Sequence, residues 1–204
     1  YAEFGLVPER PAQWCEDFAT QFDALVAARP AVASFTFGIL TAAQVARLQA
    51  VGSYVIGTAT TLAEAQAWAA VGADAVCASG MEAGGHRGTF LTPTQPGATG
   101  AAPSLADFAA SMVGTLPLVA QCVQALSIPV IAAGGIMDGR GMAGALALGA
   151  QAVQMGTAFL TCPESAIGTA YREALTHAQA TDTRTTRIFS GRPARGIVNQ
   201  IGRA

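Results

Sequence analysis

The sequence predicts an α/β fold with a parallel sheet, specifically part of a (β/α)8 TIM barrel. Short uncharged runs of small and β-branched residues alternate with segments of helical period, the order expected when helices connect parallel strands. Two near-identical phrases, AVGADAV at 70–76 and ALGAQAV at 147–153, each contain a helix end, a glycine and the start of a strand. One structural unit therefore repeats along a chain of 204 residues, enough for a single domain.

Five strand–helix units follow one another. The predicted strands are residues 32–37, 54–56, 74–78, 128–132 and 152–155, and each is mostly apolar, which favours a sheet covered on both faces. Thr41 is expected to cap the first following helix, which stops at Gly52, since a hydroxyl can accept from a free backbone N–H. The second helix is predicted over 61–71. The remaining helices are predicted at about 114–126, 141–148 and 164–177, and residues 80–103 have no regular period.

A complete barrel has eight units and roughly 250 residues. Residues 1–204 are therefore expected to be the C-terminal part of one barrel domain, with only its last five units present. We expect about 90–120 residues carrying the first three units to precede Tyr1. Open sheet edges invite pairing, so the chain should associate with its complement or form a homodimer.

Composition excludes several classes of protein. Hydrophobic residues make up 51% and charged residues 12%, so the chain is not disordered. Eleven arginines, no lysine and a net charge of -2 offer no basic run for nucleic acid or an anionic membrane. The uncharged stretches 108–137 and 141–163 are interrupted by proline or glutamine, which favours buried elements over membrane spans. Four widely spaced cysteines predict no metal site and suit a reducing, cytoplasmic location.

Glycines follow the last two predicted strands, where barrels frequently bind phosphate. Gly134 and Gly135 follow the fourth strand, and the run 154–157 (QMGT) ends the fifth. Glycine lets the backbone N–H groups approach an anion, and Thr157 adds a hydroxyl. The two loops together indicate a ligand that carries phosphate, although Gly134 and Gly135 could instead serve only a tight turn.

The segment 79–88 (SGMEAGGHRG) follows the third strand and is the most informative. His86 is one of two histidines and can titrate near neutral pH. We interpret His86 as functional, Glu82 and Arg87 as partners that order the loop, and His177 as a solvated surface residue. Cys77 ends a strand and is interpreted as a packed thiol rather than a nucleophile.

Three segments, EAGGHRG at 82–88, AAGGIMDGRG at 132–141 and VQMGTA at 153–158, together resemble the nitronate monooxygenase family. The segments SFTFG at 34–38 and FSGRPARGI at 189–197 are also similar to family segments. The resemblance extends over nearly the whole chain in the right order. It implies an FMN-binding barrel that oxidises alkyl nitronates with O2 and needs no metal.

The resemblance also implies roles for individual residues. His86 corresponds to the catalytic histidine. Gly156 and Thr157 lie near the FMN phosphate by this correspondence, and Ser79 occupies a position where the family usually has glutamine. The flavin-contacting positions are Ser79, Gly84, Gly134, Gly135, Gln154, Met155, Gly156 and Thr157.

Three other functions remain open from the residues. A flavin-dependent NAD(P)H reductase of an enoyl thioester or a quinone would use the same barrel and a similar histidine loop. A flavin-free isomerase or lyase acting on a phosphorylated metabolite would need only the two glycine loops. A barrel lacking three strands could also be inactive. The physiological substrate is not specified by the sequence.

Overall fold

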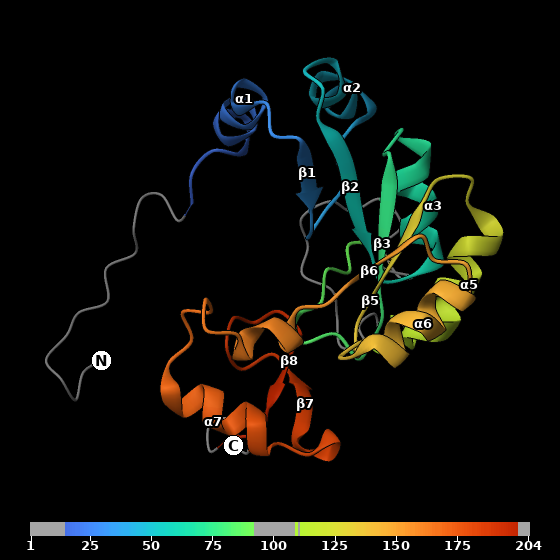
Figure 1. Ribbon diagram of the computed structural model, residues 1–204. Helices are drawn as coiled ribbons and strands as arrows, with labels where there is room; N and C mark the ends of the chain where they lie inside the picture. Colours follow the sequence, from blue (N-terminus) through green and yellow to red (C-terminus); the bar gives the residue numbers. More distant parts are fainter. Residues whose placement is uncertain (1–14, 92–108, 110, 200–204) are drawn as a thin grey trace, which may run out of the picture.

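A computed structural model describes residues 15–91, 109 and 111–199 of the protein. Its larger part is a five-stranded parallel sheet with strand order β1-β2-β3-β5-β6, which confirms the predicted α/β fold with a parallel sheet (Figure 1). The strands are β1 (Val32–Phe35), β2 (Tyr54–Ala59), β3 (Ala75–Ser79), β5 (Val130–Ala133) and β6 (Ala152–Gln154). All five predicted strands are therefore present, with no end shifted by more than three residues.

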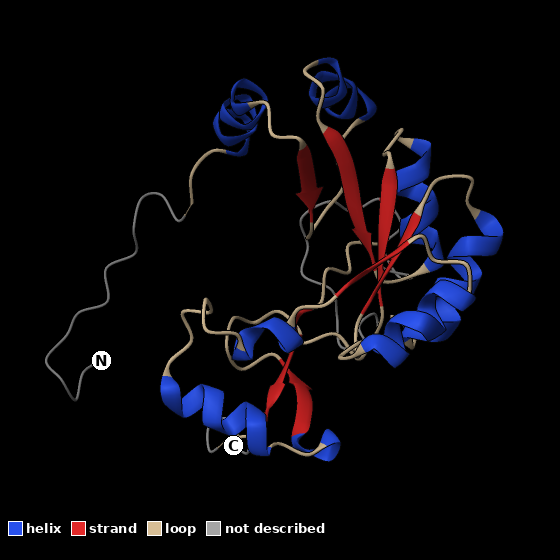
Figure 2. Ribbon diagram, in the orientation of Figure 1, coloured by secondary structure: helices blue, strands red, loops and turns tan. Residues whose placement is uncertain are grey.

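Helices join these strands and pack beside them (Figure 2). Thr41 is the N-cap residue of α2, as predicted, and forms a full capping box with Gln44. Thr61, predicted as the first residue of the second helix, is instead the N-cap of α3. An unpredicted helix, α1, precedes β1. The helices of this part are α1 (Phe18–Ala28), α2 (Ala42–Ala50), α3 (Leu62–Ala70), α5 (Thr115–Ala125) and α6 (Gly139–Ala147).

One face of the sheet carries the apolar core. Val55, Gly57 and Ala59 alternate along β2 on this face, and a Cβ built on Gly57 would lie 2.0 Å from the ring of Trp68 in α3. Trp68 is fully buried, so glycine is what lets the indole lie directly on the strand. Buried side chains of α5, such as Leu118, continue the same cluster.

The opposite face is more open, so the prediction of a sheet covered on both faces is wrong for β1, β2 and β6. Val32 and Tyr54 on this face are 52% and 41% exposed, whereas every residue of β3 except Ser79 is buried. The hydroxyls of Thr36 and Thr58, 3.1 Å apart, lie at the carboxyl end of this face. The face is therefore partly polar where the strands end.

The C-terminal part differs from the prediction. A second, antiparallel sheet with order β4-β8-β7 is formed by β4 (Gly85–His86), β7 (Thr183–Thr186) and β8 (Ala194–Ile197), beside α7 (Thr169–His177). The 3-10 helices η2 (Thr157–Thr161) and η3 (Ala180–Asp182) belong to the same part. The helix predicted from 164 begins only at Thr169, after the N-cap Gly168, and His86 lies in a strand rather than an irregular loop. Residues 92–103 of the predicted irregular segment lie outside the described residues. No helix in the described ranges is long and apolar enough to cross a bilayer.

Candidate active site

The predicted site residues at the ends of three strands lie in one row. Ser79 pairs with Ala133, and Ala133 pairs with Gln154, so β3, β5 and β6 end at the same level. The thiol of Cys77, two residues before Ser79 on β3, donates to Oε1 of Gln154 at 3.7 Å. Burial raises the pKa of Cys77 to about 11, which agrees with a packed thiol and not with a nucleophile.

The loops that follow these strands touch one another. A Cβ built on Gly84 would lie 2.8 Å from Oγ1 of Thr157, and one built on Gly135 would lie 2.9 Å from Cβ of Glu82. Gly134 approaches the backbone nitrogen of Ala83 in the same way, at 3.1 Å. The histidine segment therefore lies against both predicted phosphate loops, although Gly135 follows Glu82 by 53 residues and Thr157 follows Gly84 by 73.

The glycines of the site have two different uses. Gly134 and Gly135 have φ values of 109° and 69° and are pressed against protein atoms, so both the turn and the packing require glycine. A Cβ on Gly156, by contrast, would meet nothing within 4 Å. Within the described residues, no hydrogen bond uses the backbone N–H groups of Gly134, Gly135, Gly156 or Thr157. These unused donors, with the open backbone at Gly156, are the kind of backbone cradle that can bind an anionic group.

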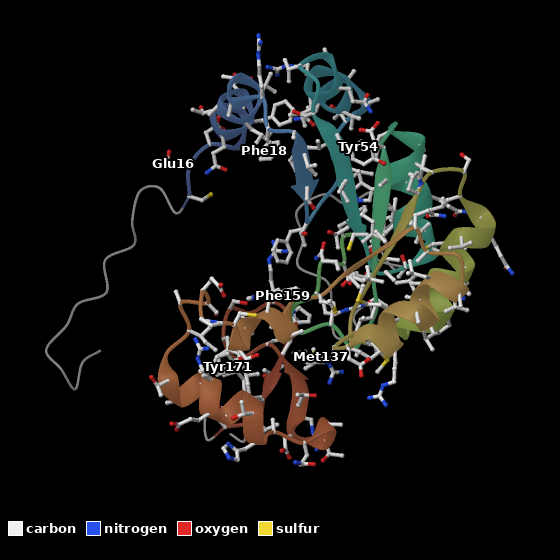
Figure 3. The ribbon with its side chains drawn as sticks, in the orientation of Figure 1. Glu16, Phe18, Tyr54, Met137, Phe159 and Tyr171 are labelled. Carbon is white, nitrogen blue, oxygen red and sulfur yellow. The ribbon has the colours of Figure 1, made fainter. Side chains whose placement is uncertain are left out.

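The side chains next to this cradle leave it accessible. Met137 and Phe159 follow the two loops and are 54% and 57% exposed (Figure 3). Apolar surface therefore flanks the backbone donors, a combination that suits a flat ligand with an anionic end.

Glu82 orders the histidine segment, as the sequence predicted. Its Oε2 accepts from the backbone N–H of Thr115 at 2.9 Å and from the Thr115 hydroxyl at 2.8 Å. Helix α5 begins at Thr115 after Gly114, which provides no side-chain cap, so Glu82 caps the helix from a distant segment.

Arg87 orders the segment from the other side. Its guanidinium is buried and donates to the carbonyl oxygens of Gly80, Ser111 and Ser79 at 2.6, 2.9 and 3.1 Å. Burial lowers the pKa of Arg87, an effect that the negative charges of Glu64 and Glu82 oppose. Arg87 thus fixes the backbone on both sides of His86, the ordering role predicted for it.

Glu64 was not predicted as part of the site. Its side chain is fully buried, and its oxygens accept from the N–H groups of Thr60, Phe90 and Leu91 at 2.6–2.9 Å. The carboxylate therefore fastens the chain that leaves β4 to the start of α3. The only sequence signal is the spacing of Glu64 three residues after the N-cap Thr61, typical of a helix start.

His86 is exposed and held by residues from two other segments. Its Nε2 lies 2.6 Å from Oγ of Ser190, and its ring forms a T-shaped contact with Phe37 at a centroid distance of 6.0 Å. Arg192 stacks on Phe37 at 5.2 Å. Phe37 has a φ of 72°, which costs a non-glycine residue on the order of 1–3 kcal/mol. Ser190, Phe37 and Arg192 were not singled out, although they lie in segments 34–38 and 189–197.

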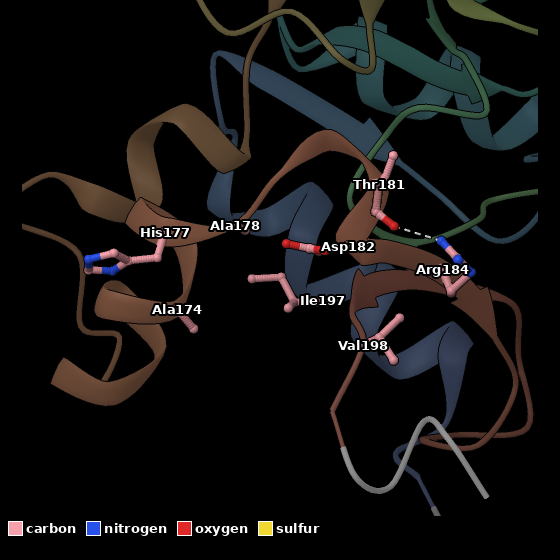
Figure 4. Close-up of a pocket in the computed structure, with 8 residues that line it drawn as sticks. All are labelled: Ala174, His177, Ala178, Thr181, Asp182, Arg184, Ile197 and Val198. Carbon is pink, nitrogen blue, oxygen red and sulfur yellow. Dashed lines mark hydrogen bonds between the residues drawn. The ribbon is translucent and has the colours of Figure 1, made fainter.

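One cavity lies away from these loops, in the C-terminal part. It has a volume of about 510 Å³ and contains His177, which is exposed as predicted (Figure 4). None of the predicted site residues lines it. Across the described ranges, no group of three metal-ligating side chains is found, so these residues offer no metal centre. The cavity is lined by Ala174, His177, Ala178, Thr181, Asp182, Arg184, Ile197 and Val198.

These features define an α/β protein whose ligand loops follow the carboxyl ends of parallel strands. The family model for nitronate monooxygenase matches residues 7–204, and the chain belongs to this family of flavoenzymes. The resemblance read from the sequence is thereby confirmed.

Individual relatives agree. The chain is 45% identical over 186 residues to a probable nitronate monooxygenase of Staphylococcus aureus (strain MSSA476), covering 91% of this chain and 49% of the relative. Nitroalkane oxidase of Streptomyces ansochromogenes is 44% identical with a TM-score of 0.82, over 91% of this chain and 50% of that one. FabK of Thermotoga maritima is 36% identical with a TM-score of 0.73, over 89% and 51%. The chain thus spans about half the length of these relatives.

Proposed function

We propose that the protein containing this chain oxidises alkyl nitronates with O2 to a carbonyl compound and nitrite. The observation that carries the proposal is the contact of the His86 segment with both strand-end loops, at Gly84–Thr157 and at Glu82–Gly135. Two nitronates and one O2 give two carbonyl groups and two nitrites, so the net reaction balances without an external reductant. Family membership supports this chemistry.

The strand-end loops fit FMN. The uncovered backbone at Gly156 and the N–H groups of Gly134, Gly135 and Thr157 would hold its phosphate, with the Thr157 hydroxyl as a further donor. Gln154, Ser79 and the backbone of Met155 and Gly84 would face the flavin ring. FMN would supply the electron transfer that the side chains cannot perform.

His86 would bind the nitro oxygens of the substrate and remove the α-proton of a neutral nitroalkane. Its exposure and its position next to the cradle suit this role. General acid–base groups contribute on the order of 10²–10⁴-fold, so His86→Asn should lose activity in that range on a neutral nitroalkane and less on a preformed nitronate. Nitrite release assayed with both substrates tests the role. Equal losses would leave His86 only a binding role.

Flavin binding is tested by Gly156→Val. The added side chain would fill the space next to the free N–H groups, so we expect colourless protein, and the visible absorbance spectrum is the measurement. Gly144→Val in α6 is a matched control, because a Cβ there also meets nothing within 4 Å but lies away from the loops. Full flavin content in Gly156→Val would refute the assignment.

A second candidate keeps the flavin and changes the reaction. The chain is also similar to FabK, whose name differs from that of the family. This similarity supports a second candidate reaction, the NAD(P)H-dependent reduction of an enoyl thioester or a quinone. Rapid anaerobic bleaching of the bound flavin by NADH would favour this reductase. Nitrite production from nitronates without NADH would favour the oxidase.

The complete architecture is also a proposal. A closed (β/α)8 barrel would cover the open face of β1, β2 and β6, and the TM-score of 0.82 with a chain of twice the matched length supports it. Four free cysteines suit a reducing cytoplasm. The intact mass of the active protein tests the extra units, because a 20.6 kDa species that binds flavin and turns over would contradict them.

A further inference from the structure

We propose that Phe37 is a specificity-determining residue whose ring packs against the alkyl group of the substrate, so that activity rises with chain length. The inference rests on the proposed role of His86 in binding the nitro group. Phe37 follows β1 by two residues, and its ring meets the imidazole at a centroid distance of 6.0 Å and an interplanar angle of 83°. A substrate whose nitro oxygens reach His86 therefore carries its alkyl group beside this ring.

The ring of Phe37 is held in place and still accessible. Arg192 stacks on it, with the guanidinium carbon 5.2 Å from the ring centroid. Phe37 is nevertheless 46% exposed in the part of the chain that the structure describes, so apolar surface remains open next to His86. Phe189, which precedes Ser190 on the loop that contacts His86, is 53% exposed and is a second candidate for this contact.

The backbone of Phe37 adopts a conformation that favours glycine, since its φ is 72°. Contacts of the preceding residue maintain this conformation. The hydroxyl of Thr36 lies 3.1 Å from that of Thr58, and a Cβ built on Gly88 would lie 2.8 Å from Cγ2 of Thr36. Residues held in such conformations cluster at ligand sites. Here the strained backbone presents a phenyl ring, where glycine would present no side chain, to the position beside His86.

Contact with the ring predicts a dependence on chain length. Burying one methylene completely favours binding by about fourfold. Because Phe37 covers one side of the chain, kcat/KM should rise by about twofold for each added methylene. The nitronates of nitropropane, nitrobutane, nitropentane and nitrohexane form the test series. The reacting carbon is the same in all four, so the slope of the series reports the surroundings of the chain.

Phe37→Gly removes the ring and relieves the backbone together. The variant should therefore keep a nearly unchanged urea midpoint while the chain-length slope falls close to zero. Phe37→Leu retains an apolar side chain and should retain most of the slope. Phe18→Ala is the matched control, because Phe18 is 52% exposed and contacts Phe22 at the same centroid distance of 6.0 Å. Its helix, α1, lies beside the amino-terminal end of β1, at the other end of the strand from Phe37 (Figure 1).

A measurement without turnover separates this proposal from the proposed function. Alkanoates present a planar carboxylate in place of the nitronate group. Calorimetric titration of the intact flavin-loaded protein with propanoate, butanoate, pentanoate and hexanoate should show affinity rising with chain length. Phe37→Gly should lose this slope as well, whereas Phe18→Ala should keep it.

An unchanged slope in Phe37→Gly in either measurement overturns the proposal, as does a wild-type protein without a slope in the titration. A slope lost in Phe189→Ala and kept in Phe37→Gly also overturns it, since the alkyl group would then lie against the loop. Failure of the proposed function is a separate result. If no nitronate yields nitrite, the oxidase fails, while the alkanoate titration still reports whether Phe37 contacts the chain.

Discussion

The parallel sheet and the C-terminal part of the molecule are stabilised in different ways. Strands β1, β2, β3, β5 and β6 and their helices contain nearly all buried apolar side chains of the described residues, whereas between residues 156 and 199 only Pro193 and Ala194 are buried. In the C-terminal part, arginine side chains form hydrogen bonds where the first region has apolar packing. Arg195, for example, donates to the carbonyl of Met81 at 3.0 Å and to the hydroxyl of Thr183 at 2.9 Å. The first region is held by packing and the second by polar contacts to the site loops.

The comparison indicates which region of the molecule positions each part of the candidate site. His86 lies where the two regions meet, since β4 pairs with β8 while the residues around it contact the sheet. A packed scaffold positions the backbone of the strand-end loops, and a lightly buried part positions the imidazole. Regions with few buried apolar contacts open at lower free energy than cores do.

The largest effect on stability is expected from Arg87→Met, because the Arg87 side chain connects the segment containing β4 to the end of β3. It removes the buried donors to the carbonyls of Gly80 and Ser111 and the positive charge near Glu64 and Glu82, at a cost of about 3 kcal/mol. Urea unfolding measures the loss, and amide exchange should rise in β4 and β8. Arg140→Met is the control, because its ion pair with Asp138 is exposed and should change stability by less than about 0.5 kcal/mol. Equal stability of the two variants would mean that Arg87 does not join the regions.

Gly57→Ala tests the packed region alone. The new methyl would overlap the ring of Trp68, so unfolding free energy should fall by about 1–3 kcal/mol. Gly144→Ala adds the same methyl where a helix leaves open space and should gain about 0.5–1 kcal/mol. If both variants gain stability, Trp68 does not lie on β2.

The cysteine thiols of the two regions should differ in how they make stability depend on pH. Burial raises the pKa of Cys77 and Cys122 to about 11 from the ordinary 9.0, whereas Cys162 in the C-terminal part is only half-buried. The folded protein therefore retains protons that the unfolded chain releases, so this stability is complete below pH 9 and is lost between pH 9 and 11. Urea midpoints should fall over that range. Alkylation at pH 8 followed by mass spectrometry should modify Cys15 and Cys162 first, and early modification of Cys77 would contradict the packed core.

The same contrast explains how much the sequence could predict. The five parallel strands and the cap Thr41 follow from local patterns of apolar residues, glycines and hydroxyls. The loop glycines and His86 could be singled out because they stand in motifs at strand ends. Strand β4 has two residues, and its pairing with β8 joins segments more than 100 residues apart, so no local period reveals it.

Contacts made through single polar atoms could not be predicted from local sequence patterns either. Ser190 contacts His86 because the loop between β7 and β8 returns to β4. The carboxylate of Glu64 accepts from the backbone N–H groups of Phe90 and Leu91, which follow β4 in the chain. The exposed face of β1 and β2 was also mispredicted, since an apolar run suits a barrel interior as well as a face covered by helices.

The smallest effect concerns the helix starts of the two regions. Helix α2 has a capping box at Thr41, and Thr41→Ala should cost about 1 kcal/mol. Helix α7 starts at Gly168 with no side-chain cap, in an extended conformation (φ -62°, ψ 151°) with open space around its Cβ position. Gly168→Asp should therefore supply the missing acceptor and a favourable charge at the helix start, gaining about 0.5 kcal/mol. Slower amide exchange in the first turn of α7 is the measurement, and Gly168→Ala, which adds bulk without an acceptor, should show none. A destabilised Gly168→Asp would mean that α7 is held at its start by contacts other than a cap, and that the C-terminal part is less loosely stabilised than its burial indicates.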